Sequence, residues 1–140
     1  MAVWRATTGT YLHPIHAILL GFPIALFSSA LAADIAYLRT AEIQWTNFSA
    51  WLISGALVVG GLVLAWALLL LVFDRRPRRL LYAAVLAVMW GLGLVNILKH
   101  SQDGWFSVQT LGLVLSVLCT LLALVAGWIA FDRDEREVAV

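Results

Sequence analysis

The stretch FSAWLISGALVVGGLVLAWALLLLVF, residues 48–73, contains no charged side chain. The hydrocarbon core of a bilayer is about 30 Å thick, and a helix of about 20 apolar residues crosses it. Three further stretches meet this criterion: residues 14–38, 80–98 and 106–131, with Asp34 as their only charged residue. The sequence therefore predicts an all-α fold, an integral membrane bundle of four transmembrane helices.

The composition supports a membrane protein and excludes several other classes. The chain is 63% hydrophobic and 12% charged, whereas soluble domains carry roughly 25% charge. A net charge of +1 gives no basic surface for nucleic acid, so the bilayer is the expected partner. We expect residues 1–140 to form one transmembrane domain that ends in a flexible polar tail, residues 132–140.

The basic residues predict the orientation of the bundle. Short connections make neighbouring spans antiparallel, so the N-terminus, the loop at residues 74–79 and the tail share one side. That side carries seven arginines, and the other carries only Arg39 and Lys99. Because basic residues favour the cytoplasmic side, both termini are predicted to be cytoplasmic. The loops at residues 39–47 and 99–105 are predicted to face outward.

Polar residues inside the first and third spans are the candidate site. An ionisable residue within a span is costly to keep there, so it is a functional candidate. His16 and Asp34 are 18 residues apart, which is five helical turns, so they share one face. That face is expected to point into the bundle. The residues between them on it are Leu20, Pro23, Phe27 and Ala30.

A second stripe lies on the third span, which runs parallel to the first. Its members, at spacings of three and four, are Met89, Gly93, Asn96, His100 and Asp103. Asp34 and His100 each lie about 30 Å along their helices from the inner boundary, so we expect them to meet at the outer surface with Asn96. A simpler interpretation stays open, in which Asp34 only bonds a neighbouring helix and HSQDG only caps and turns the chain.

The histidines are the candidate ligands for a metal or haem, namely His13, His16 and His100. His13 also precedes Pro14 in a typical helix start. His13 and His16 share one helix and cannot grip both faces of a porphyrin. His16 and His100 are expected at opposite surfaces, about 30 Å apart. Two-histidine ligation would therefore require a homodimer, and zinc would need more ligands than these spacings offer.

The runs HPIHAILLGFPIAL and VNILKHSQDGW, with Asp34 between them, resemble the domain-of-unknown-function 2231 family of small bacterial four-helix membrane proteins. The resemblance covers roughly residues 12–130. The positions that match its motifs are His16, Phe22, Pro23, Asp34, Asn96, His100, Asp103 and Trp105. Ala17 and Gly21 depart from the family pattern, and Gly21 stands where a further histidine is frequent. The resemblance implies the bacterial inner membrane. It also implies redox partners, because some members accompany Rieske-type, cytochrome c or sugar-dehydrogenase domains.

Three functions follow from these features. The first is a membrane anchor or electron-transfer subunit that binds haem b or quinone through His16, His100, Asp34 and Asn96, beside a periplasmic redox protein. The second is a non-catalytic scaffold that docks a periplasmic partner through Trp45, Trp105 and Phe106. The third is an oligomeric transporter or channel, which the apolar stripes between the polar residues disfavour. No catalytic motif predicts an enzyme acting on its own.

Overall fold

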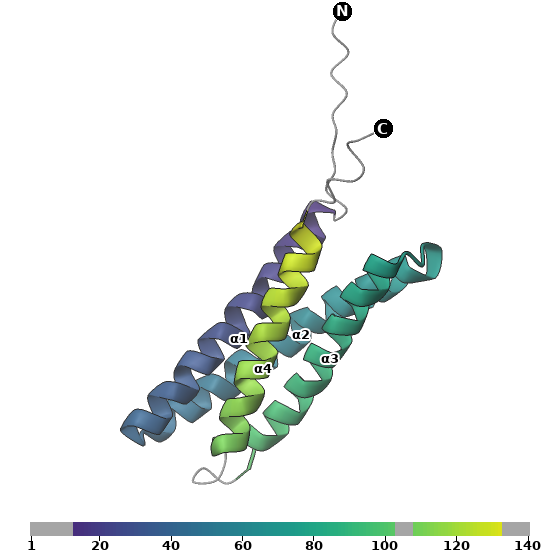
Figure 1. Cartoon of the computed structure of the whole chain (residues 1–140). Coiled ribbons are helices and arrows are strands. Elements are labelled where there is room, and N and C mark those ends of the chain that lie inside the picture. Colours follow the sequence, from purple (N-terminus) through teal and green to yellow (C-terminus); the bar gives the residue numbers. More distant parts are fainter. Residues whose placement is uncertain (1–12, 103–107, 133–140) are drawn as a thin grey trace, which may run out of the picture.

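The computed structural model describes residues 13–102 and 108–132. It contains four helices and, over those residues, no strand (Figure 1). The helices are α1 (Pro14–Thr40), α2 (Ile43–Phe73), α3 (Pro77–His100) and α4 (Thr110–Phe131). Each is long and apolar enough to cross a membrane. The predicted all-α class with four spanning helices is confirmed.

The connection between α1 and α2 is much shorter than the predicted loop at residues 39–47. Helix α1 ends at Thr40 and is capped by Ala41, which has a left-handed backbone with φ 55° and whose N–H donates to the Tyr37 carbonyl. Helix α2 then begins at Ile43. The residues expected in the loop therefore extend α2 by more than one turn, which places Thr46 on a buried helical face.

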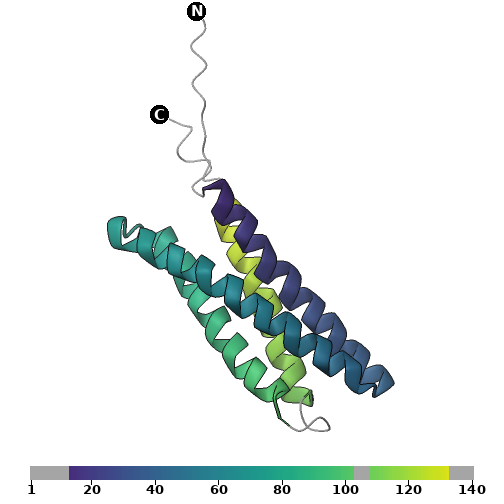
Figure 2. The same cartoon turned by 180° about the vertical axis from the view of Figure 1, so that it is seen from behind.

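The four helices form a ring in which each packs against two neighbours. The packed pairs are α1 with α2, α2 with α3, α3 with α4, and α4 with α1, so α1 and α3 face each other across the bundle. The start of α1 and the end of α4 lie side by side, at the opposite end of the bundle from the end of α3 and the start of α4 (Figures 1 and 2). Which side of the membrane the termini occupy remains a prediction.

Helices α1 and α3 run parallel with their buried residues at matching heights. Six buried positions of α1 each have a buried counterpart on α3 that follows 66 residues later in the sequence. At the two ends of the bundle, the side chains of such a pair are hydrogen-bonded to each other. The α1 set is His16, Leu20, Pro23, Phe27, Ala30 and Asp34, and the α3 set is Tyr82, Leu86, Met89, Gly93, Asn96 and His100. The first predicted stripe and the described members of the second, from Met89 to His100, therefore face the interior.

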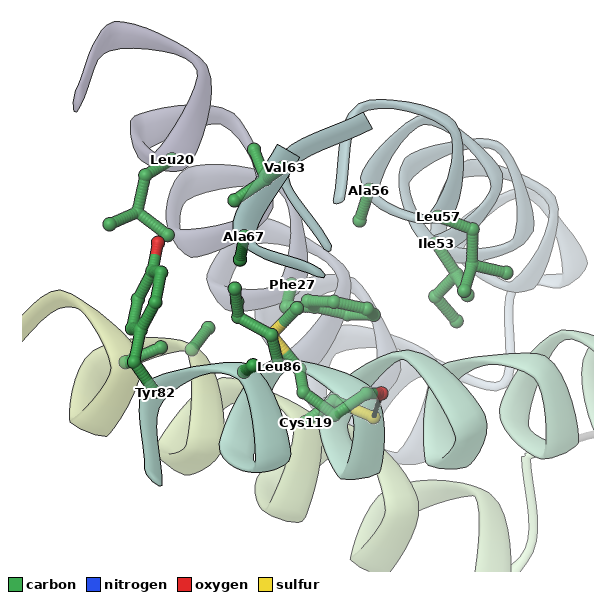
Figure 3. Packing of buried hydrophobic residues seen from close by; sticks show 14 of the residues in the cluster. Leu20, Phe27, Ile53, Ala56, Leu57, Val63, Ala67, Tyr82, Leu86 and Cys119 are labelled. Atoms are coloured by element: carbon green, nitrogen blue, oxygen red, sulfur yellow. Dashed lines mark hydrogen bonds between the residues drawn. The ribbon is translucent and has the colours of Figure 1, made fainter. Parts of the chain in front are cut away.

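The middle of the bundle is a dry apolar core between two polar ends. Phe27 lies within it close to Leu86 and Cys119 (Figure 3). Helix α3 approaches closely at Gly93, where an added Cβ would lie 3.0 Å from the Phe27 ring. The outer surface is also apolar, with Phe73 86% and Trp128 76% exposed. Such a surface fits contact with lipid rather than water.

Candidate functional site

One polar cluster centres on Asp34 and His100, at the end of the bundle that is predicted to face outward, and is called the outer cluster below. Both side chains are fully buried, and His100 Nε2 lies 2.9 Å from Asp34 Oδ1. Because α1 and α3 are not neighbours in the ring, this contact crosses the bundle axis. The sequence-based prediction that these residues meet is confirmed. Whether they bind a cofactor stays a prediction.

The hydrogen bonds of His100 determine where protons can lie. His100 Nδ1 lies 3.0 Å from the Asn96 carbonyl oxygen, which only accepts, so Nδ1 must carry a proton. The contact of Nε2 with Asp34 then needs one further proton between the two atoms. That proton belongs either to an imidazolium facing a carboxylate or to a carboxylic acid facing a neutral imidazole. In both cases the pair is neutral overall, which suits a site within a membrane.

Two serines complete the outer cluster. Ser116 Oγ donates to Asp34 Oδ2 at 2.5 Å, and Asn96 Nδ2 donates to Ser116 Oγ at 2.9 Å. Ser49 Oγ lies 3.2 Å from His100 Nε2 and donates to the Ala30 carbonyl. The sequence analysis missed both serines, although each is among the few polar residues on α2 or α4. The predicted member Asp103 lies outside the described residues, as do Trp105 and Phe106.

A pocket of about 330 Å³ adjoins this cluster where α2 begins and α3 ends. Its lining consists of Ile43, Gln44, Thr46, Asn47, Ala50 and His100. Thr46 is 6% exposed, and its hydroxyl has no hydrogen-bond partner. Leaving a buried polar group without a partner costs roughly 1–3 kcal/mol. A ligand that bonds this hydroxyl would recover that cost.

The second polar cluster lies at the opposite end of the bundle, where α1 and α3 begin. His16 Nε2 lies 2.9 Å from the Tyr82 hydroxyl, again across the axis from α1 to α3. The His16 ring also meets the edge of Trp66, with centroids 5.4 Å apart. The Tyr82 side chain is buried and points toward Leu20 of α1 (Figure 3).

His13 has a local role at the start of α1. Its Nδ1 accepts from the Ile15 N–H at 3.3 Å, with Pro14 in the first helical position. This confirms the predicted helix start. The His13 ring also stacks on Trp66, with centroids 5.9 Å apart.

Several of the ring nitrogens that could ligate haem or a metal ion are engaged in this arrangement. Both ring nitrogens of His100 have partners, and His16 Nε2 is bonded to Tyr82. Ligation through any of these three atoms would break a buried contact, whereas His16 Nδ1 has no partner. In the described part of the chain, no group of three His, Cys, Asp or Glu side chains could hold a metal ion. His13 and His16 lie at the opposite end of α1 from the Asp34–His100 pair.

Comparison with known proteins places the chain in a family. The family model described as Predicted membrane protein (DUF2231) matches residues 12–130. The chain belongs to the DUF2231 family. This match confirms the family resemblance that the two histidine-containing runs indicate. The matched region contains both polar clusters of this DUF2231 protein. Neither the curated proteins nor the solved structures include a match.

Tyr82→Phe is expected to lower the free energy of unfolding by about 1–2 kcal/mol, because it leaves buried His16 Nε2 without its partner. His16 Nδ1 already has none, so the ring would lose its one hydrogen bond. Unfolding by SDS in mixed micelles, followed by circular dichroism, measures the change. In a His16→Leu background the same substitution should cost almost nothing. An equal cost in both backgrounds would show that the hydroxyl does not act through His16.

Proposed function

We propose that this DUF2231 protein is a membrane subunit of a redox system and binds a quinone headgroup in the pocket beside His100. The observation that carries the proposal is the unpartnered, buried Thr46 hydroxyl in a pocket lined in part by His100, whose side chain is itself buried and paired with Asp34. Pockets for small ligands typically have volumes of about 300–1,000 Å³ and few polar groups. This pocket is at the lower end of that range, which suits a headgroup rather than a whole haem.

The donors in the pocket match the acceptors of a quinone. The Thr46 hydroxyl and the amides of Gln44 and Asn47 can each donate to a carbonyl oxygen. A quinone exchanges electrons together with protons. The Asp34–His100 pair, which shares one proton, is the group of this chain that would hold a proton beside it. Haem b is not part of the proposal because both ring nitrogens of His100, the histidine at this pocket, are already engaged.

The electrons would come from a partner redox protein. With the predicted orientation, the pocket opens on the periplasmic side, so that partner would be periplasmic. The pocket lies at the outer end of α2, where the Trp45 and Phe48 rings also lie with centroids 6.1 Å apart. These rings are 38% and 51% exposed and offer contact area to such a partner.

Thr46→Ala should weaken binding of a short-chain ubiquinone or menaquinone analogue about fivefold to tenfold, the value of one hydrogen bond. Binding is measured on the purified protein in nanodiscs by quenching of tryptophan fluorescence. Thr46→Ser keeps the hydroxyl and should bind as the parent does. The matched control is Thr40→Ala, whose hydroxyl bonds the Ala36 carbonyl away from the pocket. Equal binding by all four proteins would refute the site.

A non-catalytic scaffold is the second candidate, and Asp34→Asn separates the two. The amide can donate to His100 Nε2 and accept from Ser116, so the fold should persist while the shared proton is lost. A scaffold would keep its partner's activity in this variant, whereas a quinone-linked subunit would lose it. Transport ranks third, because Leu20, Phe27, Leu86 and Met89 fill the axis between the polar ends.

A further inference from the structure

A second cavity lies at the opposite end of the bundle from the quinone pocket. It is a groove of about 440 Å³ beside the α2–α3 connection. Four aliphatic side chains and one arginine line it: Leu68, Leu71, Val72, Leu80 and Arg75. Leu68, Val72 and Leu80 are 47%, 67% and 57% exposed, so the groove opens on the lipid-facing surface.

The other arginines of the connection are engaged within the protein. Asp74 Oδ2 lies 3.0 Å from Arg76 Nε and 3.3 Å from Arg79 Nη1. Arg78 donates to the Ile129 carbonyl at the end of α4, at 2.8 Å. These contacts tie the connection to its own carboxylate and to the neighbouring helix.

Arg75 differs from its neighbours. Its side chain is exposed, and within residues 13–102 and 108–132 no carboxylate forms an ion pair with it. It follows α2, which ends at Phe73, so it lies just beyond the apolar part of the helix. The groove therefore combines an aliphatic wall with one uncompensated positive charge at the height of the lipid headgroups.

We infer that this groove binds an anionic glycerophospholipid, with an acyl chain along the leucines and Val72 and the phosphate on the Arg75 guanidinium. Charge complementarity carries the choice of occupant: a zwitterionic lipid or an apolar helix would fill the groove without neutralising Arg75. Basic pockets beside transmembrane helices recognise anionic headgroups in this way. The inference is independent of the quinone site, which lies at the other end of α2.

The test uses the full chain, delipidated in detergent and mixed with phosphatidylglycerol or phosphatidylcholine of the same acyl chains. Native mass spectrometry counts the lipids retained. The parent should retain phosphatidylglycerol in preference, and Arg75→Gln should lower that retention about fivefold while leaving phosphatidylcholine unchanged. The matched control is Arg76→Gln, which removes the same charge from a residue already paired with Asp74.

A variant that fills the groove tests the acyl chain separately. Val72→Trp should lower phosphatidylglycerol retention, whereas Leu69→Trp, on an exposed position outside the groove, should not. Equal retention of the two lipids by the parent would overturn the inference. So would equal losses in Arg75→Gln and Arg76→Gln, because the attraction would then reflect the net charge of the connection rather than this groove. Circular dichroism confirms that each variant is folded.

Discussion

Asp34→Ala is expected to lower the free energy of unfolding by about 3 kcal/mol or more, the typical cost of removing one partner from a buried ion pair. His100 would then keep its Nδ1 contact with the Asn96 carbonyl, but Nε2 would keep only the weaker contact with the Ser49 hydroxyl and would face a cavity where the carboxylate was. Ser116 would lose its acceptor as well. SDS-induced unfolding in mixed micelles, followed by circular dichroism and tryptophan fluorescence, measures the loss.

Two further variants identify the cause. Asp34→Asn has the same shape and can satisfy both His100 and Ser116, so it should cost less than about 1 kcal/mol. The double variant with Asp34→Leu and His100→Leu removes both partners and should recover most of the stability lost in Asp34→Ala. If Asp34→Ala were as stable as the parent, the pair would not hold α1 to α3. A double variant less stable than Asp34→Ala would show that packing, and not the unpaired histidine, dominates.

The sequence could predict the buried faces of α1 and α3 because polar residues mark them. His16 and Asp34 on one helix, and Asn96 and His100 on the other, would be costly to expose to lipid, so they indicate which side faces inward. From their heights along parallel helices, the contact between Asp34 and His100 follows. This part of the candidate site needed only helix geometry and the order of the spans.

The contributions of α2 and α4 could not be predicted in the same way. Both helices are apolar on every side, so the periodicity that separates a buried face from an exposed one is absent. Ser49 and Ser116 therefore gave no sign that they reach the cluster, although both are buried. The turn at Ala41 could not be predicted either. Glycine or asparagine usually marks a left-handed backbone position, and here the residue is alanine.

Tyr82 illustrates a different limit. A tyrosine near the end of a span usually lies at the membrane interface, so its place near the start of α3 does not by itself indicate a buried ring. In the structure, the positions of α1 and α3 that face each other are 66 residues apart, and Tyr82 therefore lies opposite His16. The spacing of three and four residues that defines the α3 stripe leads back from Met89 through Leu86 to Tyr82, so the stripe itself indicates a buried position. The contact with His16 follows only from the register of α1 and α3.

Gly93→Leu is expected to destabilise the bundle by about 3 kcal/mol, at the upper end of the cost of overpacking a core. Gly93 lies where α3 passes closest to the centre of the core. An added Cβ alone would lie 2.9 Å from Leu57 Cδ2 and 3.0 Å from Phe27 Cζ. The Leu57 methyl can rotate away, but the fully buried Phe27 ring has no free space to enter. The larger side chain must therefore push α3 away from α1.

Gly91, two residues away on the same helix, is the matched control, because an added Cβ there meets nothing within 4 Å. Gly91→Leu makes the same chemical change and gains about 1 kcal/mol in helix propensity, so it should be neutral or stabilising. The displacement in Gly93→Leu should also separate Asp34 from His100, which lies two turns further along α3. Combining Gly93→Leu with Asp34→Ala should therefore cost less than the sum of the two single losses. If the two losses in the free energy of unfolding add strictly, the apolar core and the outer polar cluster hold the helices independently. If the double variant loses less than their sum, close packing at Gly93 is what brings the buried pair within hydrogen-bonding distance.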